Sequence, residues 1–114
     1  MPGGLLVPVV HGADRRPISE ISFAVQDLAE RAREDRLVPA DVAGGEFTVT
    51  NVGSVGTLMA FPLVNPGQAG ILAPGAVVDG RCWLTLSYDR AAIAPADADA
   101  LLERIAAALV QTSG

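Results

Sequence analysis

The sequence contains few of the side chains from which disulfides, metal sites and nucleic-acid surfaces are built. Its 114 residues include one histidine, His11, and one cysteine, Cys82. One cysteine cannot form an intramolecular disulfide, and one histidine with one cysteine cannot make a metal site. The net charge of −5, from 13 acidic and 8 basic residues, argues against partners such as nucleic acid or an anionic membrane surface.

Long apolar runs are also missing. No run approaches the roughly 20 residues that a membrane-spanning helix needs, and the N-terminus lacks the basic-then-apolar order of a signal peptide. Together with the lone cysteine, this leads us to expect a cytoplasmic protein that does not enter a membrane. Hydrophobic residues make up 50% of the chain, so we expect one folded domain, residues 1–114, rather than disorder. Its core would be modest and would gain from association.

Hydrophobic periodicity predicts four strands and two helices in the order β-α-β-β-β-α. The expected strands are residues 5–10, 46–51, 70–78 and 81–89, and the expected helices are residues 18–36 and 96–110. Asp79-Gly80 is the strongest short hairpin signal and should join the last two strands. This order predicts an α+β fold with a mixed sheet.

Each expected helix carries an apolar stripe at a spacing of three or four residues. The stripes are Ile18, Ile21, Val25, Leu28 and Ala32 in the first helix, and Leu101, Leu102, Ile105 and Leu109 in the second. Both stripes should face the core of the domain.

The stretch from Gly44 to Gly56 holds the first candidate site residue. Phe47 and Val49 alternate with two threonines, which is a strand pattern, and the glycines around them favour turns. Thr50 therefore places a hydroxyl at the end of a strand, where functional residues often gather. An ordinary strand and loop without chemistry is the alternative that the pattern leaves open.

Three motifs in a fixed order connect the chain to a known family. They are Gly44-Gly45-x-Phe47-Thr48-x-Thr50-Asn51-x-Gly53, Val64-Asn65-Pro66-Gly67-Gln68-Ala69-Gly70-Ile71-Leu72 and Leu84-Thr85-Leu86-Ser87-Tyr88-Asp89. They resemble the catalytic domain of the acyltransferase component of 2-oxoacid dehydrogenase complexes. The resemblance covers nearly the whole chain but only the second half of the family's domain. It implies half of a chloramphenicol-acetyltransferase-like domain, with a mixed β-sheet and two helices, in trimers that carry the active site between subunits.

The resemblance also implies roles for particular residues. In the family a histidine acts as general base on a thiol, and a serine or threonine hydroxyl donated across a trimer interface stabilises the oxyanion. Thr50 occupies the hydroxyl position in this chain. Asn51, Ser87 and Asp89 are the expected substrate-binding residues.

The family's His-Arg-x-x-Asp-Gly motif is lost from this chain. Arg90 stands at the histidine, Ala91 at the arginine, Ala94 at the aspartate and Pro95 at the glycine. An arginine cannot act as a general base, because its pKa lies above about 12. We therefore expect that the family's histidine-based transfer does not run. Arg90 is then either an anchor for a carboxylate or phosphate, or a surface cation paired with Asp89 or the following helix start.

The lone histidine and the lone cysteine are secondary candidates for chemistry. His11 should be a solvated residue of an early turn, with a role as a base as the alternative. Cys82 should lie buried on a strand face beside Leu84 and Leu86, as unpaired cysteines often do, with a role as a nucleophile as the alternative.

Two classes of function remain open, and with them the question of whether the chain is an enzyme. The first is a degenerate or repurposed acyltransferase-family protein that binds an acyl thioester, such as one of CoA, a pantetheine arm or a lipoyl group, in a cleft between subunits. The second is a non-catalytic trimeric core or interaction module. We expect a homotrimer, or a separate chain that supplies the missing first half, and an acyl carrier as a further partner. No metal and no covalently bound cofactor are expected.

Overall fold

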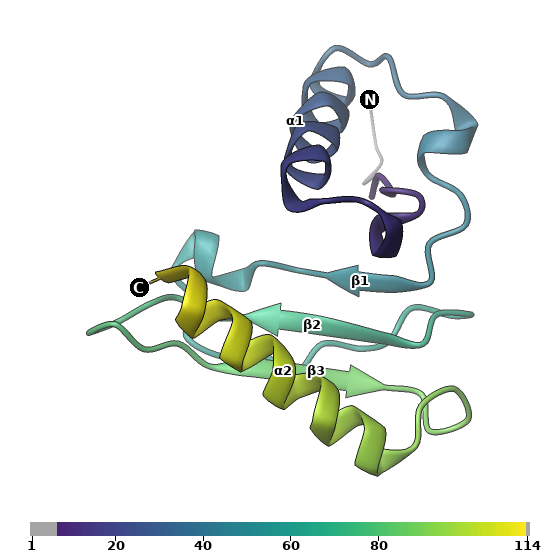
Figure 1. The fold of residues 1–114 in the computed structure, drawn as a ribbon. Coiled ribbons are helices and arrows are strands. Elements are labelled where there is room, and N and C mark those ends of the chain that lie inside the picture. Colours follow the sequence, from purple (N-terminus) through teal and green to yellow (C-terminus); the bar gives the residue numbers. More distant parts are fainter. Residues whose placement is uncertain (1–6, 114) are drawn as a thin grey trace. The chain divides into compact units, whose positions relative to one another are not determined.

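The computed structural model describes residues 7–113. The chain divides into two compact units, the first ending at Gly45 and the second beginning at Glu46. The first unit contains one α-helix and two short 3₁₀ turns, and the second contains the sheet and the other α-helix (Figure 1). Because the three strands and the long C-terminal helix belong to the second unit, most of the expected site residues do as well.

Helix α1 spans Ile18–Arg33 in the first unit. The expected helix, residues 18–36, is therefore too long by three residues at its C-terminus. Asp35 adopts a left-handed conformation with φ of 56°, while the Arg36 N–H donates to the Arg31 carbonyl at 2.7 Å and the Asp35 N–H donates to the Ala32 carbonyl at 3.2 Å. This pair of hydrogen bonds is a Schellman motif, which satisfies the last carbonyls and ends the helix.

The apolar stripe predicted for α1 is only partly correct. Leu28 is buried, and Ile21 is half-buried, but Ile18, Val25 and Ala32 are exposed in this chain. Because an α-helix has 3.6 residues per turn, a predicted stripe can be displaced by one residue from the face that is buried. In α1 the polar Arg31, and not Ala32, is half-buried on the inner side. Ion pairing explains this choice, because Arg31 binds two carboxylates there.

The strand predicted at residues 5–10 is not found. Residues 5 and 6 lie outside the described part of the chain, and residues 7–10 form no strand. The Val9 N–H donates to the Asp41 carbonyl at 2.7 Å, but Pro8 has no N–H with which to continue a ladder. The apolar run has the sequence pattern of a buried strand, but its described residues, 7–10, make only this one backbone hydrogen bond to another segment.

The second unit is built on a mixed three-stranded sheet in the order β1-β2-β3 (Figure 1). Strand β1 spans Phe47–Val49, β2 spans Gly70–Pro74 and β3 spans Leu84–Tyr88. β1 and β2 are parallel, and β2 and β3 are antiparallel. The α+β class and the mixed sheet are confirmed, although every strand is shorter than its hydrophobic pattern suggested.

The central position of β2 follows from its composition. Ile71, Leu72 and Ala73 are buried in succession, as expected for a strand that is covered on both faces. Pro74 ends the strand, since it has no N–H to donate. β2 is thus the core of this unit.

The hairpin predicted at Asp79-Gly80 is confirmed. Both residues have positive φ, 53° and 74°, which is the type I′ geometry that matches the twist of paired strands. The Val78 N–H donates to the Arg81 carbonyl at 2.8 Å, and the Arg81 N–H donates back at 3.0 Å. The turn therefore reverses the chain between β2 and β3, although its Val78–Arg81 bridge is offset by one residue from the register of the two strands, which leaves one extra residue on the β2 side.

Helix α2 spans Pro95–Ser113 and crosses one face of the sheet (Figure 1). Ala98 is buried, while Leu101, Leu102 and Ile105 are half-buried on the same side. Three members of the predicted stripe therefore face inward. The fourth, Leu109, is exposed near the end of the helix.

Between β1 and β2 the chain returns through an extended connection. The short 3₁₀ turn η3, Val52–Val55, leads into it, and a turn closed by the Gln68 N–H on the Asn65 carbonyl at 3.0 Å ends it. At its start the connection touches the backbone after β2 so closely that a Cβ on Gly75 would overlap the Leu58 carbonyl oxygen. Only glycine fits this crossing.

Candidate functional site

Thr50 and Arg90 lie at opposite ends of the sheet within one chain. The Thr50 N–H donates to the Leu72 carbonyl at 2.8 Å, whereas the Asp89 N–H donates to the Ala69 carbonyl at 2.9 Å. In the register of the sheet, Thr50 is level with Ala73 and Asp89 with Ala69, so four residue steps and two strand spacings, roughly 16 Å, separate Thr50 from Asp89. One copy of the chain therefore does not bring the hydroxyl and the guanidinium together.

Thr50 immediately follows β1 and is half-buried. Its backbone is held on both sides, because its N–H binds Leu72 and its carbonyl accepts the Val52 N–H at 3.1 Å. Within the described residues its hydroxyl has no hydrogen-bond partner. Asn51, the next residue, is exposed, and its carbonyl accepts the Ser54 hydroxyl at 2.8 Å. The backbone thus positions a Thr50 hydroxyl that is free to donate.

Ser87 and Asp89 lie on and just beyond β3. Ser87 pairs in register with Ile71 and is half-buried. The Asp89 carboxylate accepts the Ala91 N–H at 2.9 Å, and its carbonyl accepts the N–H groups of Ala92 and Ile93, each at 2.9 Å. Asp89 therefore organises the turn that leads from β3 to α2.

Arg90 is exposed at the second position of this turn. In the part of the chain that the structure describes, its guanidinium takes part in no ion pair and no hydrogen bond. The alternative in which Asp89 neutralises Arg90 is not found there, and the Asp89 carboxylate accepts a backbone N–H instead. The cation is thus presented to solvent next to a well-defined turn.

His11 and Cys82 do not join these residues. His11 is exposed, and its Nε2 lies 2.8 Å from the Ala40 carbonyl, to which it donates a hydrogen bond. Cys82 is exposed as well, so its predicted burial is wrong. The reason is that β3 begins only at Leu84, and Cys82 belongs to the hairpin arm before it.

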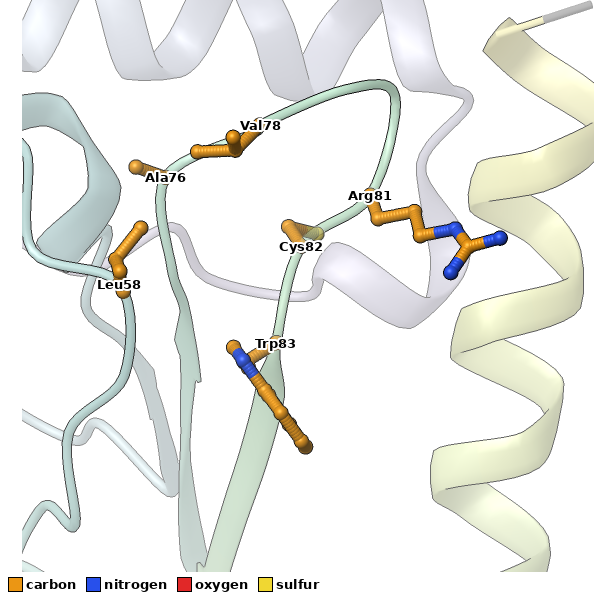
Figure 2. Close-up of a pocket in the computed structure, with 6 residues that line it drawn as sticks. All are labelled: Leu58, Ala76, Val78, Arg81, Cys82 and Trp83. Carbon is orange, nitrogen blue, oxygen red and sulfur yellow. The ribbon is translucent and has the colours of Figure 1, made fainter.

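A pocket of about 450 Å³ opens beside that hairpin arm (Figure 2). It is lined by Leu58, Ala76, Val78, Arg81, Cys82 and Trp83. The Arg81 side chain points away from it, which leaves an apolar interior (Figure 2). Of the candidate residues, only Cys82 lines it, and the Asp79-Gly80 hairpin is the one sequence signal that points to its location.

The strongest charge cluster lies in the first unit. Arg31 donates to Asp41 at 2.6 Å and to Asp27 at 3.0 Å, and the Val38 N–H donates to Asp41 at 2.9 Å. The hydrogen bond from Arg31, followed by that from Val38, holds the pKa of Asp41 below its usual value. All these groups are paired with one another, so the cluster joins α1 to the 3₁₀ turn Pro39–Asp41 and leaves no free ligand group.

Two further classes of site are not found in residues 7–113. No group of three or more His, Cys, Asp and Glu side chains there could hold a metal ion. Neither helix in that range is both long and apolar enough to cross a bilayer.

Comparisons of the sequence and of the structure with known proteins point to one family. The family model of the catalytic domain of 2-oxoacid dehydrogenases acyltransferase matches residues 1–113. The dihydrolipoyllysine-residue acetyltransferase component of the pyruvate dehydrogenase complex of Corynebacterium glutamicum is 42% identical over 120 residues, which cover 91% of this chain and 18% of that protein. The chain therefore spans less than a fifth of this curated relative.

Solved structures agree with this assignment. A truncated catalytic core of the 2-oxoacid dehydrogenase multienzyme complex from Thermoplasma acidophilum has a TM-score of 0.78 and 37% identity, covering 90% of this chain and 50% of that one. Azotobacter vinelandii dihydrolipoamide acetyltransferase, studied for the roles of a serine, a histidine and an asparagine in its catalytic mechanism, has a TM-score of 0.75 and 31% identity, covering 90% of this chain and 47% of that one. The chain belongs to the family of 2-oxoacid dehydrogenase acyltransferases, through their catalytic domain.

Proposed function

We propose that this chain is a core subunit that binds an acyl thioester, or a related anionic ligand, between two copies and does not perform histidine-based acyl transfer. Arg90 is the observation that carries the proposal. It stands at the position where the family places its general base, it is exposed, and it has no counter-ion among the described residues.

The chemistry of Arg90 differs from that of a histidine. A guanidinium stays charged and cannot accept a proton at neutral pH, so it cannot activate a thiol. It can bind a carboxylate or phosphate through two parallel hydrogen bonds. The Thr50 hydroxyl can donate to a thioester carbonyl oxygen beside it. Such a site polarises its ligand without removing a proton.

The ligands that fit this chemistry carry both a carbonyl and an anionic group. Acyl thioesters of CoA have phosphates as well as the thioester, and a dicarboxylic acyl group on a pantetheine or lipoyl arm has a free carboxylate. Asn51, Ser87 and Asp89 would line the ligand. We place the protein in the cytoplasm, as a homotrimer or together with a separate first-half chain, with an acyl carrier as the source of the ligand.

A second candidate is a non-catalytic trimeric core or interaction module. It is favoured by the large apolar side chains that the second unit leaves exposed, of which Phe61 and Leu63 are 78% and 88% accessible. Exposed side chains of this size gather at surfaces that contact other proteins.

Calorimetry separates the two candidates. Acyl-CoA and small carboxylates are titrated into wild type, Arg90→Gln, Arg90→His and, as control, Arg104→Gln, which removes an exposed cation from α2. A charged hydrogen bond contributes about 1.5–3 kcal/mol, so Arg90→Gln should weaken binding by about 10- to 100-fold, while Arg104→Gln should not. If wild type binds neither ligand class, or Arg90→Gln binds as tightly as wild type, the non-catalytic module is the better description.

A further inference from the structure

The pocket beside the hairpin arm, hereafter the hairpin pocket, has the size and the walls of a ligand site (Figure 2). Its volume of about 450 Å³ lies within the range of roughly 300–1,000 Å³ that is typical of small-molecule sites. Leu58 and Trp83 reach it from two different segments and are 56% and 62% accessible, while Ala76 beside them is half-buried. Large apolar side chains that surround a hollow indicate an occupant that enters it.

The lining of the hairpin pocket offers little to a polar ligand. None of its six residues is acidic, and its one charged residue, Arg81, directs its side chain away from the interior (Figure 2). The other polar side-chain groups are the Cys82 thiol, which is a weak donor, and the single N–H of Trp83. A carboxylate or phosphate buried there would lose its water without gaining a counter-charge. The part of a ligand that enters the pocket is therefore a hydrocarbon group.

Gly75 shows on which face of the sheet the hairpin pocket opens. The Gly75 N–H donates to the Trp83 carbonyl at 2.8 Å, so the two residues are cross-strand partners, and partners project to the same face. A Cβ on Gly75 would overlap the Leu58 carbonyl oxygen, so Leu58 crosses the sheet on the face to which Gly75 points. The two large walls of the pocket, Leu58 and Trp83, therefore lie on one face.

Thr50 projects to this same face at the same end of the sheet. In the register of β1 and β2, Thr50 is level with Ala73, two residues before Gly75, and residues two apart along a strand share a face. Two residue steps and two strand spacings, roughly 12 Å, separate Thr50 from Trp83. The unpaired hydroxyl and the apolar pocket thus lie within reach of one ligand.

We infer that the hairpin pocket holds the hydrocarbon chain of an acyl thioester whose carbonyl oxygen accepts the Thr50 hydroxyl, and that the ligand is a medium-chain acyl thioester of CoA. The inference rests on the proposed function, which gives Thr50 the role of donor to the carbonyl. Three bonds of an extended chain advance about 3.6 Å. A span of roughly 12 Å therefore corresponds to an acyl group of about eight to ten carbon atoms.

Two other classes of acyl group fit this arrangement less well. An acetyl group ends at its methyl carbon and leaves the hairpin pocket empty. A dicarboxylic acyl group of sufficient length would bury its free carboxylate against apolar walls. The phosphates of CoA, and not a carboxylate of the acyl group, are then the anions that bind Arg90.

The chain-length dependence of binding tests the inference. Acetyl-CoA, butyryl-CoA and octanoyl-CoA are titrated into wild type by calorimetry, and affinity should rise about fourfold for each methylene that becomes buried. Trp83 is the one tryptophan of the chain, so its fluorescence reports on the pocket alone. Octanoyl-CoA should shift the emission to shorter wavelength, and acetyl-CoA should not. Equal affinity for the three thioesters, or an emission that octanoyl-CoA leaves unchanged, would overturn the inference.

Variants separate the pocket from the rest of the site. Cys82→Asp places a charge on the pocket wall and should reduce the affinity for octanoyl-CoA to that for acetyl-CoA. Val77→Asp adds the same charge at an exposed residue that does not line the pocket, and should keep the difference. Leu58→Ala, which introduces no charge, should weaken octanoyl-CoA binding by about 10-fold or more, as the loss of a large apolar contact does. Unchanged octanoyl-CoA binding in both Cys82→Asp and Leu58→Ala would overturn the inference.

Alkylation of Cys82 shows what fills the hairpin pocket. Octanoyl-CoA should slow the reaction of its exposed thiol with iodoacetamide, whereas acetyl-CoA should not. Protection that grows with protein concentration in the absence of ligand would overturn the inference, because a second copy would then occupy the pocket. Binding that depends on Arg90 but not on chain length would overturn this inference alone. A chain-length dependence that persists unchanged in Arg90→Gln and Thr50→Ala would overturn the proposed function and leave the apolar pocket.

Discussion

The carboxylate of Asp89 accepts the N–H of Ala91 at 2.9 Å and leaves its neighbour Arg90 without an ion pair among the described residues. Adjacent opposite charges in a turn would ordinarily be expected to pair. Here the Asp89 carboxylate accepts the first of three successive N–H groups after β3, and the Asp89 carbonyl accepts the other two. The exposed Arg90 guanidinium is therefore accessible to a ligand.

Wild type should show no acetyl transfer between acetyl-CoA and dihydrolipoamide above the uncatalysed rate. A positioned general base contributes about 10²- to 10⁴-fold to such reactions, and Arg90 cannot supply it. The measurement is release of free CoA thiol over time. Turnover that disappears in Thr50→Ala would contradict this prediction, since it would reveal another base acting with the Thr50 hydroxyl.

Gly75→Ala should destabilise the second unit by about 1–3 kcal/mol or more, as overpacked sites do. The added Cβ would overlap the carbonyl oxygen of Leu58, and a backbone atom cannot swing aside. Urea unfolding followed by circular dichroism measures the effect. Gly80→Asn is the control, because asparagine tolerates the left-handed turn position and nothing lies within 4 Å of a Cβ there. Equal stability of the two variants would contradict the close crossing.

Asp41→Asn should lower the melting temperature at neutral pH but not in strong acid. Arg31 holds the pKa of Asp41 below its unfolded value, so the stabilisation is complete above about pH 3.9 and is lost as the pH falls through the folded pKa. The melting temperatures of wild type and variant should therefore converge once the pH lies below the folded pKa of Asp41. Asp14→Asn, which removes an exposed carboxylate without an ion pair in the described residues, should show no such pH-dependent difference.

The elements that sequence reasoning predicted well are those with strong local signals. Asp79-Gly80 specifies its own turn through two residues that tolerate positive φ, and the stripe of α2 has enough turns to fix the inner face. The strand predicted from the apolar run at residues 5–10 is wrong for its described part, because hydrophobicity does not reveal whether a partner strand exists. The end of α1 was missed because Asp35 takes a left-handed position that glycine more often fills.

The candidate site could be predicted only in part. Position in the motif placed Thr50 at a strand end and Ser87 on a strand, and both placements are confirmed. Exposure could not be predicted for Cys82, since it depends on where β3 begins. The distance between Thr50 and Arg90 within one chain could not be predicted either, because it follows from the register of three strands and not from a spacing along the sequence.

Pro62 has a consequence for solubility. A strand with one defective edge can be the last strand of a sheet but cannot serve as an interior one. Because Pro62 lacks an N–H, the edge served by the even-numbered residues of the extended stretch 58–64 offers no complete template on which a further chain could stack. Growth into cross-β fibrils, the usual hazard of an exposed apolar stretch, is hindered at that edge.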